Sequence, residues 1–338
     1  MHRHPSLTFN AIYEPLPGSR LGGLFKSHWP GYRKWFLREG DSKRPSYLKS
    51  RRMLSSHMPE LEGTYDSILE LIDGSDSQAR CLALYCPTPF FSGCSQAVWS
   101  RGPLALIRNY DYAPQLCDGM ILFSAWNGTR VIATSDCLWG ALDGMNEHGL
   151  AVSLAFGGRK VVGEGFGISL VVRYILETCR DTHDATEVLQ RVPVHMAYNI
   201  TMLDRSGDYA TAMVSPDREA SIRHLDVATN FQGMVEWPEH ATFFDTLGRQ
   251  RFLEQCLRDP GETLETVVAR LLHAPLYRPI DQQGWGTLYS VRYDPVRGSI
   301  CYLWPGKLWE FSFRVFEPGR YTAHYQHVPV HIHGSHQA

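Results

Sequence analysis

Six consecutive residues, FSGCSQ at 91–96, place a cysteine directly after a glycine, far from the start of the chain. If the Gly93–Cys94 peptide bond were cut, Cys94 would carry a free α-amino group with a pKa of about 7.7–8.0. That amine could act as general base for the thiol of the same residue, with no histidine needed. Gly93 lets the backbone adopt a strained geometry and leaves its carbonyl open to attack. If this bond is cut, the two residues suit an N-terminal nucleophile; a buried free thiol is the alternative for Cys94.

A second group of charged residues, RNYDY at 108–112, begins fourteen residues after Cys94. On the neighbouring strand of a hairpin, Arg108 and Asp111 could meet the new N-terminus. The Asp111 carboxylate would orient the α-ammonium group, and the Arg108 guanidinium would favour the thiolate. An ordinary surface pair at the end of a strand is the alternative.

The other seven cysteines form neither a CxxC pair nor a Cys/His cluster with zinc spacing. We expect most of them to be buried free thiols, and we expect no metal and no cofactor. The C-terminal segment HVPVHIHGSHQ could place two histidines on one face of a strand, although a solvated tail explains it as well. Its histidines are His327, His331, His333 and His336. No GxSxG motif is present, and GEGFGIS lacks the setting of a dinucleotide loop.

The segments around these residues predict alternating blocks of strands and helices. Residues 1–20 should be irregular, 24–40 and 58–74 helical, and the apolar run ARCLALYC at 79–86 a buried strand. Short apolar segments joined by turns predict strands at 95–100, 104–112, 120–126, 129–135 and 150–156. Helices should follow at 167–192, with a cap at 182–184. Strands should occupy 197–204, 209–215 and 221–226; helices 243–259 and 261–274; and strands 286–294, 299–306 and 307–313. Hairpin connections favour antiparallel sheets, so we expect a layered α+β domain with two sheets stacked between helices.

Composition narrows the classes of protein. The chain has 338 residues, 43% hydrophobic and 20% charged, with a net charge of −2, which gives no reason to expect a nucleic-acid partner. No apolar run approaches the length of a membrane span, and the first residues lack the apolar region of a secretory signal, so we expect a cytoplasmic protein. Residues 1–60 carry eleven Lys and Arg against four acids. This segment is interpreted as a solvated basic layer on an acidic body, with a basic arm for an acidic partner as the alternative.

Five motifs occur in an order that resembles the choloylglycine hydrolases and penicillin acyltransferases. They are GCSQAVW, RNYDY, LDGMNEHGLAVSL, ATNFQG and TLYSVRYDPVRGSICYLWPG, and the resemblance runs from about residue 57 to 306. That group consists of N-terminal-nucleophile (Ntn) hydrolases acting on linear amides. The resemblance implies a four-layer αββα sandwich with two stacked antiparallel sheets. It also implies a propeptide or α-chain at 1–93 and a catalytic β-chain at 94–338, packed together as one domain.

The same resemblance implies roles for site residues. Cys94 would become the nucleophile after autocatalytic cleavage, and Arg108 and Asp111 would hold its amine and thiol. Asn146 of DGMNEHGL and Asn230 of ATNFQG would be the oxyanion donors, for which side-chain amides are chemically suited. A late arginine of the site would be Arg251 in GRQRFLEQ, with Arg249 as the alternative.

Together these features predict an amidohydrolase that cleaves a linear, non-peptide C–N bond through an acyl-thioester on Cys94. The partner would be a small acylated amide, and a homo-oligomer is left open. One alternative is an acyltransferase that passes the acyl group to an amine. Another is an uncleaved, non-catalytic scaffold of the same fold, and a third is a metal hydrolase that uses the C-terminal histidines.

Overall fold

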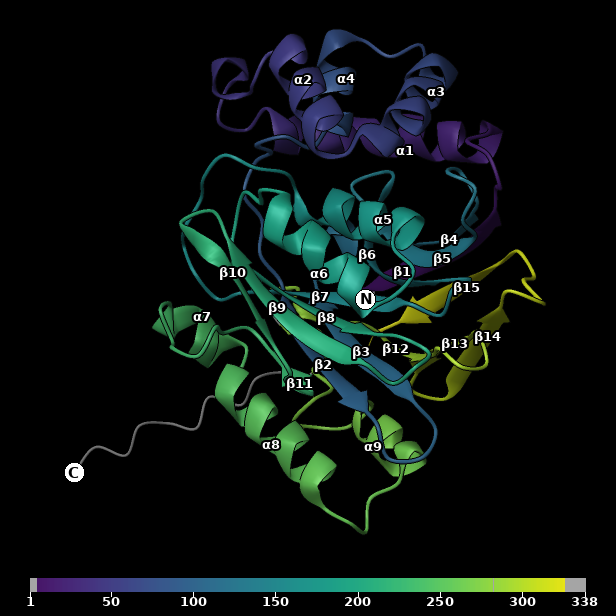
Figure 1. The fold of residues 1–338 in the computed structure, drawn as a ribbon, viewed down its shortest axis with the longest axis vertical. Helices are drawn as coiled ribbons and strands as arrows, with labels where there is room; N and C mark the ends of the chain where they lie inside the picture. The colour runs from purple at the N-terminus through teal and green to yellow at the C-terminus, as the bar shows by residue number, and fades with distance from the viewer. Residues whose placement is uncertain (1–4, 282, 326–338) are drawn as a thin grey trace.

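The computed structural model describes residues 5–281 and 283–325, and its centre is a pair of stacked β-sheets (Figure 1). Within these residues, one sheet has nine strands in the spatial order β10-β9-β8-β7-β6-β5-β4-β1-β15. The strands are β1 (Ser6–Tyr13), β4 (Met120–Ser124), β5 (Val131–Asp136), β6 (Gly140–Asn146), β7 (Ala151–Phe156), β8 (Tyr198–Leu203), β9 (Tyr209–Ser215), β10 (Arg218–Arg223) and β15 (Gly319–His324).

The second sheet has six strands in the described part of the chain, in the order β11-β2-β3-β12-β13-β14. They are β2 (Gly93–Trp99), β3 (Ala105–Tyr112), β11 (Val227–Ala228), β12 (Gly286–Asp294), β13 (Ser299–Trp304) and β14 (Lys307–Ser312). β2 packs across the gap between the sheets onto β7. Every residue of β2 and β3 is buried, because one face of each strand meets the other sheet and the opposite face meets helices. The polar residues of the two strands, Ser95, Gln96, Arg108, Asn109 and Asp111, are therefore buried as well.

Helices cover both outer faces of the sheet pair. α5 (Ile168–Thr178) and α6 (Thr182–Arg191) lie on the nine-stranded sheet, while α8 (Thr246–Arg258) packs on β2 and β11. Figure 1 shows α7 (Pro238–Phe243) and α9 (Leu264–Arg270) on the same side as α8. It also shows α1 (Ser19–Phe36), α2 (Tyr47–His57), α3 (Glu62–Ile72) and α4 (Asp76–Leu82) as a further helical layer above α5 and α6. Short 3-10 turns occur at Asp41–Lys43, Pro59–Leu61 and Pro114–Leu116. The predicted α+β class with an αββα arrangement is confirmed.

Three local predictions were wrong. The first residues are not irregular: β1 lies between β4 and β15, and its pairing with β4 is parallel, so the larger sheet is mixed rather than antiparallel. The first half of the run ARCLALYC, residues 79–82, is the end of helix α4, which starts at a capping box formed by Ser75 and Gln78. The cap of α6 is Asp181, whose side chain accepts a hydrogen bond from the Asp184 main chain, one residue before the predicted cap.

The first 93 residues are thoroughly joined to the rest of the chain. β1 completes the larger sheet, and side chains of β1 and α1–α4 share one apolar core with both sheets. The Gly93–Cys94 bond lies inside strand β2 and not in a linker. Cleavage of the chain between Gly93 and Cys94, which would divide it at 1–93 and 94–338, stays a prediction. No helix in residues 5–281 and 283–325 has the length and hydropathy needed to cross a membrane.

Candidate active site

Cys94 is completely buried near the start of β2, where its cross-strand partner is Tyr110 of β3. Gly93 is paired with Asp111 in the same ladder. Because side chains alternate along a strand, the Cys94 thiol points between the two sheets, and the Ser95 hydroxyl points outward to α8. We call the face of β2 that carries the Cys94 thiol the thiol side, and the face toward α8 the helix side.

On the thiol side, the Nη2 atom of Arg108 lies 3.4 Å from the Cys94 Sγ atom, and both residues are fully buried. Arg108 also forms an ion pair with Asp143, and it donates a hydrogen bond to the Leu142 carbonyl. The hydroxyl of Tyr289 donates to Asp143 at 2.6 Å. A buried charge is tolerated only when it is paired and hydrogen-bonded, and Asp143 satisfies this requirement for Arg108.

On the helix side, the Asn230 side chain connects the nucleophile to α8. Its Oδ1 atom accepts hydrogen bonds from the Cys94 main-chain N–H at 3.0 Å and from Arg249 at 2.8 Å. Its Nδ2 atom donates to the carbonyls of Ser92 and Phe156, at 3.2 and 3.0 Å. Asn230 therefore contacts the chain on both sides of the Gly93–Cys94 bond.

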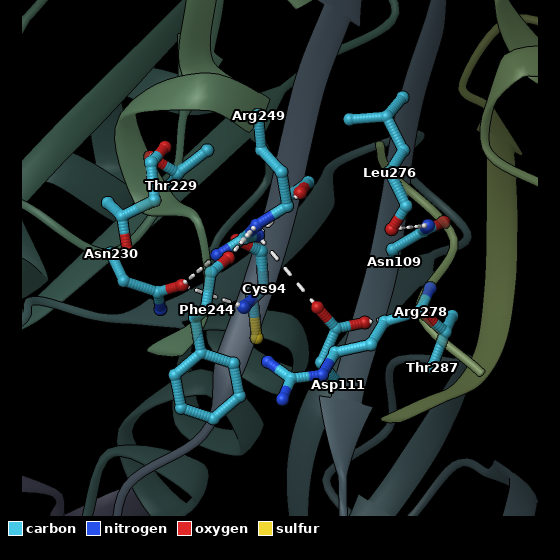
Figure 2. Close-up of polar contacts among 12 residues, drawn as sticks. Cys94, Asn109, Asp111, Thr229, Asn230, Phe244, Arg249, Leu276, Arg278 and Thr287 are labelled. Carbon is cyan, nitrogen blue, oxygen red and sulfur yellow. Dashed lines mark hydrogen bonds and ion pairs between the residues drawn. The ribbon is translucent and has the colours of Figure 1, made fainter. Parts of the chain in front are cut away.

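Arg249 is the arginine that the structure brings to Cys94. Figure 2 shows it reaching from α8 to the Cys94 carbonyl and to Asn230; the Nη1–carbonyl distance is 2.5 Å, and the same Nη1 lies 2.6 Å from the Ser95 hydroxyl. Burial lowers the pKa of Arg249, and the nearby Asp111 and Cys94 partly offset this. The guanidinium nevertheless stays charged at neutral pH, because arginine begins with a pKa above about 12.

Arg251, the preferred residue in the sequence prediction, is exposed on the same helix. Two residues along an α-helix correspond to a rotation of about 200°, so Arg249 and Arg251 face nearly opposite directions. The choice of Arg251 was therefore wrong in position, and its alternative Arg249 occupies the site.

Asp111 lies beside Gly93 on the neighbouring strand, and among the described residues it makes no direct hydrogen bond to Cys94. Its Oδ1 atom accepts from the Thr287 hydroxyl at 2.7 Å, and its Oδ2 atom is 3.9 Å from Arg249. Figure 2 places this carboxylate across from Asn230, with Cys94 between them. Cys94, Arg108, Asp111 and Asn230 are thus all brought together.

Asn146 is not brought to this cluster. Its Nδ2 atom donates to the Leu176 and Cys179 carbonyls at the end of α5, at 3.1 and 2.7 Å. Its Oδ1 atom accepts from the main-chain N–H groups of His148 and Leu150, both at 3.1 Å. It therefore closes the β6–β7 turn and faces the helix-covered side of the sheet. Asp143, three residues earlier on β6, faces inward to Arg108, as strand alternation requires.

Only glycine fits at position 93, because neighbouring atoms occupy the space that a Cβ atom would need. A Cβ atom at this position would lie 2.3 and 2.6 Å from two carbons of the Phe244 ring and 3.1 Å from the Asp111 Cβ. The main chain of Gly93 is therefore packed directly against the Phe244 ring.

Asp143, Ser95 and the Thr287–Tyr289 strand were missed as site residues, although each lies in a quoted motif. A buried arginine in RNYDY demands a buried carboxylate, and this demand was the available signal for Asp143. Within residues 5–281 and 283–325, no group of three or more His, Cys, Asp or Glu could hold a metal ion. The histidines at 327, 331, 333 and 336 lie outside the described residues.

Comparison of the sequence with known families identifies the family of this chain. The family model of acyl-coenzyme A:6-aminopenicillanic acid acyl-transferase matches residues 99–306. No curated protein matched the chain. Similar solved structures include a mutant conjugated bile acid hydrolase from Clostridium perfringens, with 11% identity, a TM-score of 0.46, and coverage of 71% of this chain and 99% of that one.

Two further structures are similar at the same level. Penicillin V acylase from Agrobacterium tumefaciens has 14% identity and a TM-score of 0.46, over 65% of this chain and 86% of that one. The Caenorhabditis elegans ortholog of N-acylethanolamine-hydrolyzing acid amidase has 20% identity and a TM-score of 0.42, over 60% and 93%. The family model covers more than half of the 338 residues, and the chain therefore belongs to the acyl-coenzyme A:6-aminopenicillanic acid acyl-transferase family.

Proposed function

We propose that this protein is an amidohydrolase that cuts itself between Gly93 and Cys94 and then cleaves linear amides with Cys94 as N-terminal nucleophile. The proposal rests on one observation: the main-chain nitrogen and the sulfur of Cys94 are each held by a different buried side chain. Its nitrogen donates to Asn230 Oδ1, and its sulfur lies against the Arg108 guanidinium. An N-terminal nucleophile needs its amine held close to its thiol but in a defined direction.

The self-cleavage step would be an N-to-S acyl shift. The Cys94 sulfur attacks the Gly93 carbonyl carbon, a C–S bond forms, and the C–N bond breaks. The thiol proton passes to the departing nitrogen, which becomes the α-amine of Cys94. Water then attacks the thioester, which restores the thiol and leaves Gly93 with a free carboxylate.

Turnover of a substrate would repeat this chemistry. The α-amine takes the thiol proton, the sulfur attacks the amide carbonyl of the substrate, and the proton is given to the leaving amine. Water resolves the acyl-thioester. Arg108 supports the thiolate with its positive charge, and Asp143 holds Arg108 in place.

Asn230 is suited to two tasks in this scheme. Its Oδ1 atom would hold the α-amine, as it now holds the Cys94 N–H. Its Nδ2 atom donates to the Ser92 carbonyl. If residues 87–93 swing out of the site after cleavage while the rest of the N-terminal chain stays bound, this donor becomes free for the oxyanion of the substrate. Losing one oxyanion donor typically costs about 10²–10³ in kcat. Asn146 cannot supply the second donor, because all of its amide hydrogen-bonding positions are engaged elsewhere.

The first 93 residues would remain bound after cleavage as an α-chain. β1 is hydrogen-bonded to β4 on one side and to β15 on the other, and α1–α4 share the core. The cleaved protein should therefore behave as one particle in native solution and as two chains only under denaturing conditions.

The test is amine release from a panel of N-acyl amides by wild type, Cys94→Ala and a matched Cys301→Ala variant. Cys301 is also a buried cysteine of the smaller sheet, and burial raises the pKa of its thiol to about 11. We expect Cys301→Ala to behave as wild type and Cys94→Ala to be inactive, with an acid-quenched acyl adduct found only on Cys94. Activity that survives in Cys94→Ala would contradict the proposal.

Transfer of the acyl group to an amine is the second candidate, since the matched family is named for an acyl-transferase. Adding an amine acceptor to the same assay separates the two. Hydrolysis predicts free acid at all acceptor concentrations, and transfer predicts a new amide whose yield saturates with acceptor.

A further inference from the structure

Four aromatic side chains surround the ring of Phe91, two residues before the scissile glycine. The Trp285 ring stacks on it at 5.6 Å with an interplanar angle of 2°, and the Trp237 ring meets it edge-on at 5.3 Å. His240 and Phe156 complete the group, at 5.8 and 6.3 Å between ring centroids. We call Phe156, Trp237, His240 and Trp285 the aromatic cage.

The cage is continuous with the site around Cys94. The Phe244 ring lies directly against Gly93, and it packs on His240 at 4.7 Å and on Trp285 at 5.8 Å. The carbonyl of Phe156 accepts the hydrogen bond from Asn230 Nδ2. Phe244 therefore contacts both Gly93 and two members of the cage, which places the cage next to Cys94.

The cage differs from ordinary core in two respects. Phe91 remains 38% exposed, so its ring occupies an open site and not a sealed interior. His240 is only 4% exposed, yet neither of its ring nitrogens completes a hydrogen bond within the described residues. Burial, with the Arg249 charge adding to it, lowers the pKa of His240 to about 4, although the Ser92 main chain is close enough to favour the protonated ring slightly. A neutral imidazole offers one donor and one acceptor.

The chemistry of self-cleavage explains why this matters for substrates. In the thioester formed by the acyl shift, Gly93 is bonded to the Cys94 sulfur, and Ser92 and Phe91 extend from it as its acyl chain. A substrate acyl group forms the same thioester bond to the same atom. Whatever holds the Phe91 ring in the first reaction is thus placed to hold the far end of an acyl group in later ones.

We infer that the aromatic cage is the acyl-binding site, and that Phe91 occupies it as an internal stand-in for an acyl group that ends in an aromatic ring. This inference rests on the proposed function and deepens it. Since the backbone of Ser92 and Gly93 separates the Phe91 ring from the scissile carbonyl, the ring of the substrate must be joined to its carbonyl by an extended linear spacer. The unpaired His240 nitrogens would favour a hydroxyl or amide group near that ring.

The test uses the cleaved wild-type enzyme and aminomethylcoumarin amides of acetyl, hexanoyl and phenylhexanoyl groups. The hexanoyl amide has the same spacer without the ring. We expect kcat/KM to be at least about tenfold higher for phenylhexanoyl than for hexanoyl, because a stacked ring adds binding beyond area alone. Trp285→Ala should reduce this ratio to about two. Trp29→Ala, which removes a half-buried tryptophan of α1, should leave the ratio unchanged.

A second measurement needs no variant enzyme. The peptide PTPFFSG, residues 87–93, should inhibit the cleaved enzyme competitively, and the same peptide with Phe91→Ala should inhibit at least about tenfold more weakly. Equal kcat/KM for the phenylhexanoyl and hexanoyl amides, or equal inhibition by both peptides, would overturn the inference while leaving the amidohydrolase intact. If no amide is hydrolysed in a Cys94-dependent way, the proposed function itself fails, and the inference fails with it.

Discussion

Substituting Gly93 by alanine is the sharpest local perturbation that the structure offers. The new Cβ would lie 2.3 and 2.6 Å from carbons of the Phe244 ring, whereas carbon atoms prefer about 3.5–4.0 Å. The ring cannot move away cheaply, because it packs on Phe243, His240 and Trp285 at centroid distances of 4.8, 4.7 and 5.8 Å. We expect Gly93→Ala to lower the free energy of unfolding by about 1–3 kcal/mol, as for overpacking of a filled core.

A double-mutant cycle isolates this clash. Phe244→Ala removes the obstructing ring and leaves a cavity that costs about 3–5 kcal/mol. The double variant should be more stable than the sum of the two losses by about 1–3 kcal/mol, because the alanine methyl then enters space that the ring has left. The assay is urea unfolding followed by tryptophan fluorescence, with every chain carrying Cys94→Ala so that all remain uncut. Losses that add to within about 0.5 kcal/mol would refute the contact.

Three further predictions follow from the positions of Arg249, Asn146 and Glu177. Arg249→Met should abolish self-cleavage and lower the free energy of unfolding by about 3–5 kcal/mol. The Arg251→Met variant, changed on the same helix, should still be cleaved and should change that free energy by less than about 0.5 kcal/mol. Intact mass measures the cleavage, and urea unfolding measures the stability. Asn146→Ala should destabilise the fold by about 1–3 kcal/mol through its lost hydrogen bonds yet leave kcat within about threefold of wild type, while the loss of an oxyanion donor would lower kcat by about 10²–10³. Burial raises the pKa of Glu177 from 4.5 to about 7, against a weaker opposing effect of Arg173. The folded chain therefore binds more protons than the unfolded chain between these values, and stability should fall by up to about 3 kcal/mol as pH rises from 4.5 to 7; Glu177→Gln, unfolded in urea at pH 5 and pH 8, should lose this dependence.

Sequence patterns predicted the layers well because hydrophobic period and turn residues report directly on which faces are buried. They predicted β2, β3 and the two helical blocks, whereas the grouping of Cys94, Arg108, Asp111 and Asn230 was expected from the ordered motifs of the family resemblance. They failed for β1, whose eight residues SLTFNAIY are partly polar and pair with strands more than a hundred residues away. Such pairing is a tertiary effect that a local window does not contain.

The site errors have one physical origin. Asn146 and Asp143 belong to the same motif, and Arg249 and Arg251 to the same helix, so motif order alone does not say which member faces the nucleophile. The direction of each side chain follows from strand parity or from helix rotation relative to the sheet. That phase is settled by packing: Asn146 faces α5, and Arg249 faces Cys94.

The run EWPEHATFF at 236–244 hints at an apolar acyl pocket, but the full aromatic cage could not be assembled from the sequence. Trp237 and His240 lie in or beside α7, Trp285 precedes β12, and Phe156 ends β7, so these residues come from three separate parts of the chain. Aromatic residues at such positions are most often core, and only their contacts with Phe91 distinguish a binding site from packing.

The central claim is that Cys94 becomes an N-terminal nucleophile, and intact-mass spectrometry of the purified protein under denaturing conditions tests it most directly. Wild type should give two chains that end at Gly93 and begin at Cys94, and Cys94→Ala should give one full-length chain. A single full-length chain in both samples would contradict the account, because Cys94 would then lack the free amine on which every later step depends.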